Sequence, residues 1–475
     1  MWPSATAEGA FGRSHTGDSN AASQTALRMG PRVPRRSVPV LQSKAMRVSV
    51  LGAGYVGLTT ATCLADIGHT VTVFDTNPER AIALRRGEVP FHEPRLPDLL
   101  ANVVASGRLR PVADVDDAMT DAELILVCVG TPLDLDGEAD LSQVHAACRS
   151  IAARTRATPV VIRSTLPLGE TINASSWLSR EGLQTVATNP EFLRQGAAID
   201  DFMAPTRIVI GTPDGRTNTA AEALIQLYAG ISAPTLVTDF NSAEMIKNAA
   251  NAYLATKLSF VNEVADLCEA YGADITAVVN GIGLDPRIGA TYLGAGIGFG
   301  GSCLPKELAN MVRLGHRRGL AVPLMAGAAQ TNEQRPSLIV DRIEDAVGSV
   351  RGCRVALLGL AFKPNTDDTR YSPAIALAEK LITRGAVVVA HDPVARLARS
   401  ESPTGFSRAE SVVDAIEGSD VVVLATEWPE YLDLDWPDLS TRARRAVVFD
   451  GRNALDAERV RAAGWRVMQV GRASR

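Results

Sequence analysis

The sequence has few cysteines, no long apolar segment and no excess of positive charge. None of the six cysteines has the spacing of a metal ligand, so we expect no metal site and reduced thiols in a cytoplasmic protein. No apolar run reaches the roughly 20 residues that cross a bilayer, which argues against a membrane partner. The net charge of -5 argues against nucleic-acid binding, because phosphate backbones normally require a basic surface. A basic pocket for a phosphorylated small molecule stays compatible with these figures.

The first 45 residues differ from the rest of the chain. They are rich in Ser, Pro, Gly and Arg and show neither a helical nor a strand period, which predicts disorder. Met46 directly precedes an apolar strand pattern, so residues 1–45 are alternatively an over-extension of the reading frame.

Two regions of alternating strand and helix patterns flank a helical region. The predicted strands are 48–51, 71–75, 124–130, 160–164, 186–189 and 207–210, then 354–359, 386–391, 421–425 and 446–450. Such alternation is typical of parallel, doubly wound sheets. Ser242 to Tyr271 has apolar residues at helical spacing and predicts one long central helix. We therefore expect an α/β protein with two Rossmann-like domains, at 46–238 and 350–475, joined by a helical region at 239–335.

A glycine-rich turn follows the first of these strands. Gly52, Gly54 and Gly57 have the G-x-G-x-x-G spacing and open a helix that includes Val56. The three glycines serve the tight turn, the approach of a pyrophosphate and close helix–sheet packing. Asp75 ends the next strand, where an acid accepts hydrogen bonds from ribose hydroxyls and disfavours a 2′-phosphate. This pattern predicts NAD, although Arg80 lies nearby. The alternative is a turn that binds nothing, with Asp75 at the surface.

A second glycine run ends in a cysteine. Gly298 to Glu307 reads Gly-Phe-Gly-Gly-Ser-Cys-Leu-Pro-Lys-Glu, which places Cys303 at the expected start of a helix. Helix-terminal amides and Lys306 both favour a thiolate, so Cys303 is a candidate nucleophile. The alternative is an inert core thiol.

Two further segments carry polar groups with catalytic potential. Lys247 and Asn251 share one face of the long helix, where they can hold a water or an oxyanion, or are alternatively solvated. Glu191 follows a strand at the carboxyl edge of the first sheet, where an acid–base residue faces the ligand. Its alternative role is to stabilise a helix N-terminus.

Taken together, these motifs resemble the UDP-glucose/GDP-mannose dehydrogenase family, from about Met46 to the C-terminus and in the family's order. The segments that carry the resemblance are 52–58, 129–132, 164–167, 189–193, 298–307, 362–370 and 450–453.

The resemblance implies a four-electron oxidation of a nucleotide sugar at C6 with two NAD⁺. By this analogy Cys303 forms a thiohemiacetal and then a thioester, and Lys247 and Asn251 stabilise oxyanions and hold the water. Glu191 acts as general base, with Thr131 and Glu307 as further catalytic residues.

Binding residues also carry over by motif. For NAD these are Gly52, Gly54, Val56, Gly57, Asp75, Arg80, Thr131, Thr165, Gln195, Lys306 and Arg370. For the nucleotide sugar they are Glu191, Phe192, Leu193, Arg194, Gln195, Lys247, Asn251, Arg287, Tyr292, Leu293, Gly294, Ala295, Gly296, Gly300, Lys363 and Arg452. Arg287 resembles an arginine that reaches the neighbouring subunit's site, which implies a homodimer or a higher homo-oligomer.

Two positions depart from the family pattern. Glu307 stands where the family usually has Asp, and Gln195 stands where it often has Glu. The first moves a carboxylate by one methylene, and the second removes a charge. Both changes put the rate in doubt more than the reaction type.

The segments 285–289 and 296–300 resemble the UDP-glucose branch more than the GDP-mannose branch. The resemblance thus implies UDP-glucuronate synthesis, a step of nucleotide-sugar metabolism that supplies polysaccharides. GDP-mannose and UDP-N-acetylhexosamine are the alternative substrates. A non-catalytic NAD-binding regulator is the alternative from another class, although such a protein is expected to have lost Cys303, Lys247 or Glu191.

Overall fold

The computed structural model describes residues 44–132, 134, 138–155, 157–180, 185–397 and 405–472. Apart from Lys44 and Ala45, the segment predicted to be disordered or over-extended therefore lies outside the described residues. Among the helices of the described part, none is both long and apolar enough to cross a membrane.

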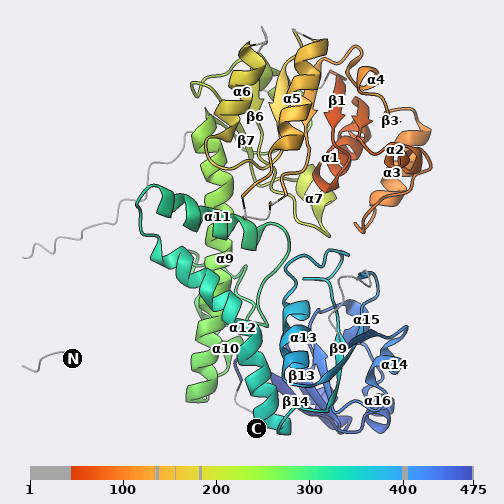
Figure 1. The fold of residues 1–475 in the computed structure, drawn as a ribbon, viewed down its shortest axis with the longest axis vertical. Coiled ribbons are helices and arrows are strands. Elements are labelled where there is room, and N and C mark those ends of the chain that lie inside the picture. Colours follow the sequence, from red (N-terminus) through yellow and green to blue (C-terminus); the bar gives the residue numbers. More distant parts are fainter. Residues whose placement is uncertain are drawn as a thin grey trace, which may run out of the picture. The chain divides into compact units, whose positions relative to one another are not determined.

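The first sheet has eight strands in the order β3-β2-β1-β4-β5-β6-β7-β8 (Figure 1). In that order they are β3 (Leu109–Val112), β2 (Thr70–Phe74), β1 (Arg47–Leu51), β4 (Leu124–Val127), β5 (Val160–Ile162), β6 (Val186–Thr188), β7 (Ile208–Thr212) and β8 (Thr235–Asp239). Its helices are α1 (Tyr55–Asp66), α2 (Pro78–Arg85), α3 (Leu96–Ala105), α4 (Val115–Met119), α5 (Ser142–Arg154), α6 (Glu170–Arg180), α7 (Ala198–Met203) and α8 (Thr219–Leu227).

Two separate apolar cores cover the two faces of this sheet. One core contains Leu58 of α1 and Leu224 of α8, and the other contains Ile151 of α5 and Leu178 of α6. Helices on both faces explain why strands such as Leu124–Val127 are apolar throughout, since neither face meets water. The predicted doubly wound arrangement is confirmed.

One strand pair departs from the expected parallel pattern. β6 and β7 pair antiparallel, with Thr188 opposite Gly211. The chain therefore leaves β6 and enters β7 at the same edge of the sheet. Residues 189–207, which include Glu191, stay at that carboxyl edge and do not cross over a face, and this keeps Glu191 where ligands of such sheets bind.

A helical region follows, consisting of α9 (Phe240–Tyr271), α10 (Ile275–Gly283), α11 (Leu304–Arg317) and α12 (Pro323–Val347). α9 spans 32 residues; Asp239 caps its start by accepting a bond from Ser242 N, and Gly272 ends it in the left-handed conformation. α12 continues beyond the predicted limit at 335, with Pro336 inside it. Burial of Ile339, Val340 and Ile343 in the next core holds those additional turns.

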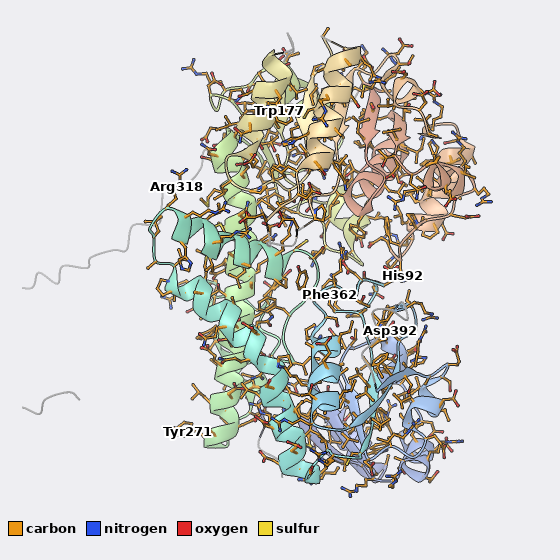
Figure 2. The ribbon with its side chains drawn as sticks, in the orientation of Figure 1. His92, Trp177, Tyr271, Arg318, Phe362 and Asp392 are labelled. Atoms are coloured by element: carbon orange, nitrogen blue, oxygen red, sulfur yellow. The ribbon has the colours of Figure 1, made fainter. Side chains whose placement is uncertain are left out.

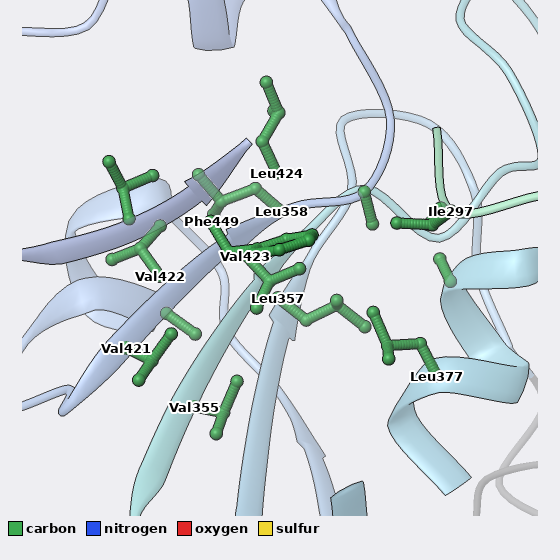
Figure 3. Packing of buried hydrophobic residues seen from close by; sticks show 14 of the residues in the cluster. Ile297, Val355, Leu357, Leu358, Leu377, Val421, Val422, Val423, Leu424 and Phe449 are labelled. Atoms are coloured by element: carbon green, nitrogen blue, oxygen red, sulfur yellow. The ribbon is translucent and has the colours of Figure 1, made fainter. Parts of the chain in front are cut away.

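The second sheet has six parallel strands in the order β11-β10-β9-β12-β13-β14. They are β11 (Phe406–Arg408), β10 (Val387–His391), β9 (Arg354–Leu358), β12 (Val421–Leu424), β13 (Val447–Asp450) and β14 (Arg466–Gln469), with α13 (Pro373–Thr383), α14 (Val412–Ile416), α15 (Pro429–Leu432), α16 (Trp436–Arg442) and α17 (Ala457–Ala462). Figure 3 shows Leu357, Val423 and Phe449 packed within its core, beside Ile297 from the glycine-rich segment before α11.

Candidate active site

Cys303 is the N-cap residue of α11 and lies at the end of a glycine-rich segment. A Cβ on Gly300 would meet Tyr371 O at 2.2 Å, and a Cβ on Gly301 would meet the Phe362 ring at 2.7 Å. Gly301 also has a positive φ of 81°. Only glycine allows the backbone to lie this close to Tyr371 and Phe362, so the glycine residues determine the position of the Cys303 sulfur.

The Cys303 thiol is open to solvent but has protein on most sides. This burial is the largest cause of a raised pKa, Glu191 raises the pKa further, and Lys247 opposes both. The cation that favours the thiolate here is Lys247, whereas the sequence pointed to Lys306. Lys306 Nζ instead pairs with Glu307 Oε1 at 3.1 Å. The alternative of an inert core thiol is also wrong, because Cys303 is exposed.

Glu191 and Lys247 form a buried ion pair beside this thiol. Lys247 Nζ donates to Glu191 Oε1 at 3.0 Å, and each residue is only 5% exposed. Glu191 follows β6 without starting a helix, and its Oε2 accepts a bond from Leu193 N. Both alternatives given for these residues, a solvated lysine and a helix-stabilising glutamate, are therefore wrong.

Each member of the pair keeps the other charged. Burial alone would raise the pKa of Glu191, but Lys247, the Leu193 amide and Arg163 bring that pKa below its usual value. Burial alone would lower the pKa of Lys247, but the negative charges of Glu191 and of ionised Cys303 raise it. The pair thus provides one fixed cation and one fixed carboxylate at neutral pH.

Two residues predicted to be catalytic, Asn251 and Glu307, lie near this pair, and a third, Thr131, lies at the edge of the first sheet. Asn251 is buried one turn after Lys247, and its Nδ2 has no hydrogen-bond partner, so the amide is free to bind a ligand. Glu307 is buried, and its charge acts on both Lys247 and Cys303. Thr131 Oγ1 donates to Thr165 O at 2.9 Å, which joins the ends of two adjacent strands.

The glycine turn at the first sheet has the geometry expected of a dinucleotide site. Gly52 has φ of 101°, a Cβ on Gly57 would lie 1.9 Å from Gly52 O, and nothing lies within 4 Å of a Cβ position on Gly54. Open space at Gly54 leaves the α1 N-terminus accessible to a phosphate. Val56, in the first turn of α1, is half-buried.

Asp75 is fixed at the end of β2 and is mostly buried. Its Oδ2 accepts bonds from Ala53 N at 2.9 Å and Arg80 Nη1 at 3.0 Å. Arg80 is therefore neutralised by the acid that was expected to discriminate against a 2′-phosphate. The alternative of a surface aspartate is wrong, because the side chain is only 12% exposed.

Several predicted binding residues already have protein partners. Gln195 Nε2 donates to Asp368 Oδ2, Arg370 pairs with the same carboxylate, and Arg194 pairs with Asp201. Arg452 donates to three carbonyls, those of Ala425, Gly298 and Phe362. These contacts connect segments of both sheets. Arg452 keeps a second N–H on each terminal nitrogen, so it can bind a ligand without losing them.

The remaining predicted residues vary in exposure. Lys363 lies near the Phe362 ring (labelled in Figure 2), and burial lowers its pKa. In the predicted nucleotide loop, Leu293, Ala295 and Gly296 are buried and Tyr292 is half-buried, whereas Gly294 is exposed. Arg287 pairs with Asp285, two residues before it in the chain, and its side chain is 85% exposed.

Sequence reasoning missed three residues that shape the site. Glu244 accepts bonds from Gly169 N and Thr171 N, which fixes the loop after Thr165 to α9. Arg163 is buried and donates to Asn189, and Arg207 stacks on Phe192 at 3.8 Å from the ring centre. Each of these charged residues stands next to a recognised motif in the sequence, but that position does not show which residue its side chain contacts.

Models of a single family match nearly all of the chain from residue 46. The NAD binding domain of the UDP-glucose/GDP-mannose dehydrogenase family matches residues 46–232, its central domain 241–334 and its UDP binding domain 356–457.

Named relatives and solved structures match over similar lengths. A UDP-glucose 6-dehydrogenase of Rhizobium meliloti is 40% identical over 90% of this chain and 100% of its own length. The UDP-glucose 6-dehydrogenase TuaD of Bacillus subtilis is 38% identical over 90% of this chain and 93% of its own. A UDP-glucose dehydrogenase structure from Pyrobaculum islandicum aligns with a TM-score of 0.83 at 39% identity, over 93% of this chain and 100% of that one. A UDP-D-ManNAc dehydrogenase structure from Pyrococcus horikoshii has a TM-score of 0.80 at 27% identity, over 90% and 100%.

Proposed function

This chain belongs to the UDP-glucose/GDP-mannose dehydrogenase family, and we propose that it oxidises C6 of UDP-glucose to the carboxylate of UDP-glucuronate with two NAD⁺. The observation that carries the proposal is the placement of an exposed thiol, Cys303, under the charges of Lys247 and Glu191. We assign the NAD site to residues 46–238 and the nucleotide-sugar site to 350–475, with 239–335 between them supplying Lys247, Asn251 and Cys303.

NAD fits the first sheet of this chain. Gly52, Gly54 and Gly57 bring the α1 N-terminus to the phosphates, and Asp75 faces the ribose. We assign further cofactor contacts to Val56, Arg80, Thr131, Thr165, Gln195, Lys306 and Arg370. Bound there, NAD⁺ accepts the hydride that leaves C6 in each of the two oxidations.

Side chains of the protein transfer the protons and form the covalent bond to the substrate. In the first oxidation, Glu191 accepts the hydroxyl proton, directly or through water, while Lys247 stabilises the alkoxide. Glu191 then releases this proton to solvent. Cys303 Sγ bonds to the aldehyde carbon, the C=O π bond breaks, and the thiol proton passes through the freed base to the carbonyl oxygen, which becomes the hydroxyl of a thiohemiacetal. Because burial and Glu191 raise the pKa of this thiol, its proton has to be removed before or during the attack.

Hydrolysis completes the second half of the reaction. Once the second oxidation has converted the thiohemiacetal to a thioester, a water held by Asn251 attacks its carbonyl carbon, and Lys247 again stabilises the oxyanion. The C–S bond breaks and the Cys303 sulfur recovers a proton. In total, one alcohol, two NAD⁺ and one water give one carboxylate, two NADH and three protons.

A substrate panel tests this function directly. We expect two NADH per UDP-glucose, measured by absorbance at limiting sugar, and at least tenfold lower kcat/KM for GDP-mannose and UDP-N-acetylglucosamine. A preference for either of these sugars would reassign the substrate. The absence of NADH formation with all three would favour the non-catalytic regulator. One NADH with release of the aldehyde would exclude the covalent role of Cys303.

We further propose that the enzyme is a homodimer built on α9. The large side chains of Tyr253, Phe260, Leu267 and Tyr271 are 53–85% exposed on that helix. The first three recur about every two turns, and Tyr271 follows about one turn later. An unpartnered apolar stripe on a long, straight element suits pairing with a second copy. In this proposal the exposed Arg287 extends to the partner's site.

A charge in the middle of this stripe tests the dimer. Phe260→Asp is expected to shift the sedimentation coefficient from that of a dimer to that of a monomer at micromolar concentration, because a carboxylate would be desolvated at the interface. Lys380→Asp on the exposed face of α13 is the matched control. A monomeric wild-type protein would refute the proposal.

We place the enzyme in the cytoplasm. All six cysteines are free thiols, as a reducing compartment requires.

A further inference from the structure

The segment that leads to Cys303 is held along its backbone by side chains from other elements. Gly296 N donates to Asn262 Oδ1, and Gly296 O accepts a bond from Arg335 Nε, both at 2.9 Å. Gly298 O accepts from Arg452, and Ile297 N donates to Gly451 O. The backbone of Phe299 is held by Asn332.

Asn332 of α12 binds both backbone groups of one residue. Its Oδ1 accepts a bond from Phe299 N at 2.9 Å, and its Nδ2 donates to Phe299 O at 3.0 Å. A carboxamide is the only uncharged side chain with a donor and an acceptor in this arrangement. The pair of bonds fixes the rotation of the Phe299 peptides as well as their position, four residues before Cys303.

Arg335, one turn later on α12, is the most deeply buried arginine of the described residues. It is 0% exposed, and its guanidinium bonds to Gly296 O and to Asp266 of α9. Burial of a cation is unfavourable unless it is paired and hydrogen-bonded. The ion pair with Asp266 stabilises the cation, and its Nε–H is directed at the carbonyl of the glycine segment, while Nη2 has no hydrogen-bond partner among the described residues.

The two groups needed for the first oxidation come from elsewhere. Lys247 lies on α9, and Glu191 follows β6 of the first sheet. Release of the glycine segment would therefore displace the sulfur and leave the Lys247–Glu191 pair in place. A misplacement of about 1 Å at a reacting atom is enough to lower a rate about 100-fold.

We propose that Asn332 and Arg335 are positioning residues that place Cys303 for capture of the aldehyde. This inference rests on the proposed oxidation of UDP-glucose. It predicts that loosening the segment uncouples the two oxidations, because the aldehyde forms normally but is captured too slowly by sulfur.

Asn332→Ala tests the inference through the fate of the aldehyde. We expect the rate of uronate formation to fall about 100-fold. The NADH yield should fall from two per sugar towards one when hydroxylamine is present to trap the aldehyde, and the trapped oxime should be detected by mass spectrometry. Gln334→Ala, at the exposed neighbouring position, should retain two NADH per sugar and form no oxime.

A structural role alone would give a different result. If Asn332→Ala lowered activity only in proportion to the folded fraction, with two NADH per sugar and no oxime, the proposal would be overturned. Asn332→Asp serves if the alanine variant does not fold, because it keeps the shape and the bond from Phe299 N but loses the donor to Phe299 O. Its expected uronate rate lies between those of wild type and Asn332→Ala.

A measurement without substrate separates this inference from the proposed function. Iodoacetamide alkylates Cys303 at a rate set by the accessibility of the sulfur and by its thiolate fraction, and peptide mass spectrometry follows that rate. A segment released from Asn332 exposes the thiol more often, so we expect several-fold faster alkylation in Asn332→Ala and no change in Gln334→Ala. An unchanged alkylation rate in Asn332→Ala would overturn the positioning role even if UDP-glucose proved to be the wrong substrate. A wild-type protein that is inactive on UDP-glucose would refute only the proposed oxidation.

Discussion

Cys303→Ser is expected to lower turnover of UDP-glucose by about three orders of magnitude while NAD⁺ affinity stays within about twofold of wild type. Serine adds to the aldehyde as a much weaker nucleophile, and its alkoxide is a much poorer leaving group than a thiolate. Cofactor affinity is spared because the Gly52 turn belongs to the first sheet, whereas Cys303 caps α11. Steady-state NADH formation and calorimetric NAD⁺ titration provide the two measurements.

The other cysteines provide a matched control for this variant. Cys353 is buried, and its thiol donates to Ser349 O at 3.4 Å, a bond that serine can also make. Cys353→Ser should therefore keep wild-type turnover. A Cys303→Ser enzyme that retained more than a tenth of the wild-type kcat would refute the covalent step.

Lys247→Met is expected to lower kcat by about 10²–10³-fold and to destabilise the protein by about 3–5 kcal/mol. The kinetic loss follows from removal of the only fixed cation assigned to the oxyanions. The loss of stability follows because Glu191, 5% exposed, would be left as a buried charge without its partner. The exposed Lys380→Met should change neither quantity.

A double variant separates the two effects. Lys247→Met combined with Glu191→Gln removes the buried charge, so thermal unfolding should return close to the wild-type midpoint. Activity should stay low, because both groups assigned to catalysis are then absent. Recovery of activity in the double variant would exclude the catalytic roles, and failure to recover stability would exclude the ion-pair explanation.

In Lys247→Met, the contribution of Glu191 to the pH dependence of stability should have the opposite sign from that in wild type. In wild type the pKa of Glu191 is depressed, so its stabilisation is present above the ordinary carboxyl pKa and is lost as the pH falls through the depressed value. Without Lys247, burial dominates and raises the pKa of Glu191. Lys247→Met should therefore become more stable as the pH falls from 8 towards 5, whereas wild type should not.

Lys247→Met should also slow the alkylation of Cys303. Lys247 lowers the pKa of Cys303 against the effects of burial and Glu191. Its removal raises that pKa further and leaves less thiolate at neutral pH. Alkylation of Cys303 at pH 7.5 is therefore expected to be slower in Lys247→Met, in contrast to the acceleration expected for Asn332→Ala.

The strands that sequence reasoning missed share one position in the fold. β3 and β8 form the two edges of the first sheet, and β11 and β14 form the two edges of the second. β8 and β11 contain no fully buried residue, so neither has an apolar pattern that can be recognised in the sequence. Interior strands such as β12, which is buried throughout, have a continuous apolar pattern that can be predicted.

The sequence alone determined the features that depend only on neighbouring residues in the chain. The glycine spacing at 52–57 specified a turn that only glycine can form, and Cys303 was predicted at the start of a helix where it now caps α11. Glu191, Lys247 and Asn251 could also be predicted as candidate catalytic residues, because each lies within a short motif of fixed spacing.

Tertiary structure alone decided how these groups act on one another. Glu191 and Lys247 are 56 residues apart in the chain but 3.0 Å apart in space, and their mutual charge outweighs the effect of burial on both pKa values. Cys303 was expected to be a ready thiolate, yet its surroundings raise its pKa, because a neighbouring carboxylate and the dense protein oppose the local cation. Burial and charge depend on distances through space, and no pattern along the sequence encodes those distances.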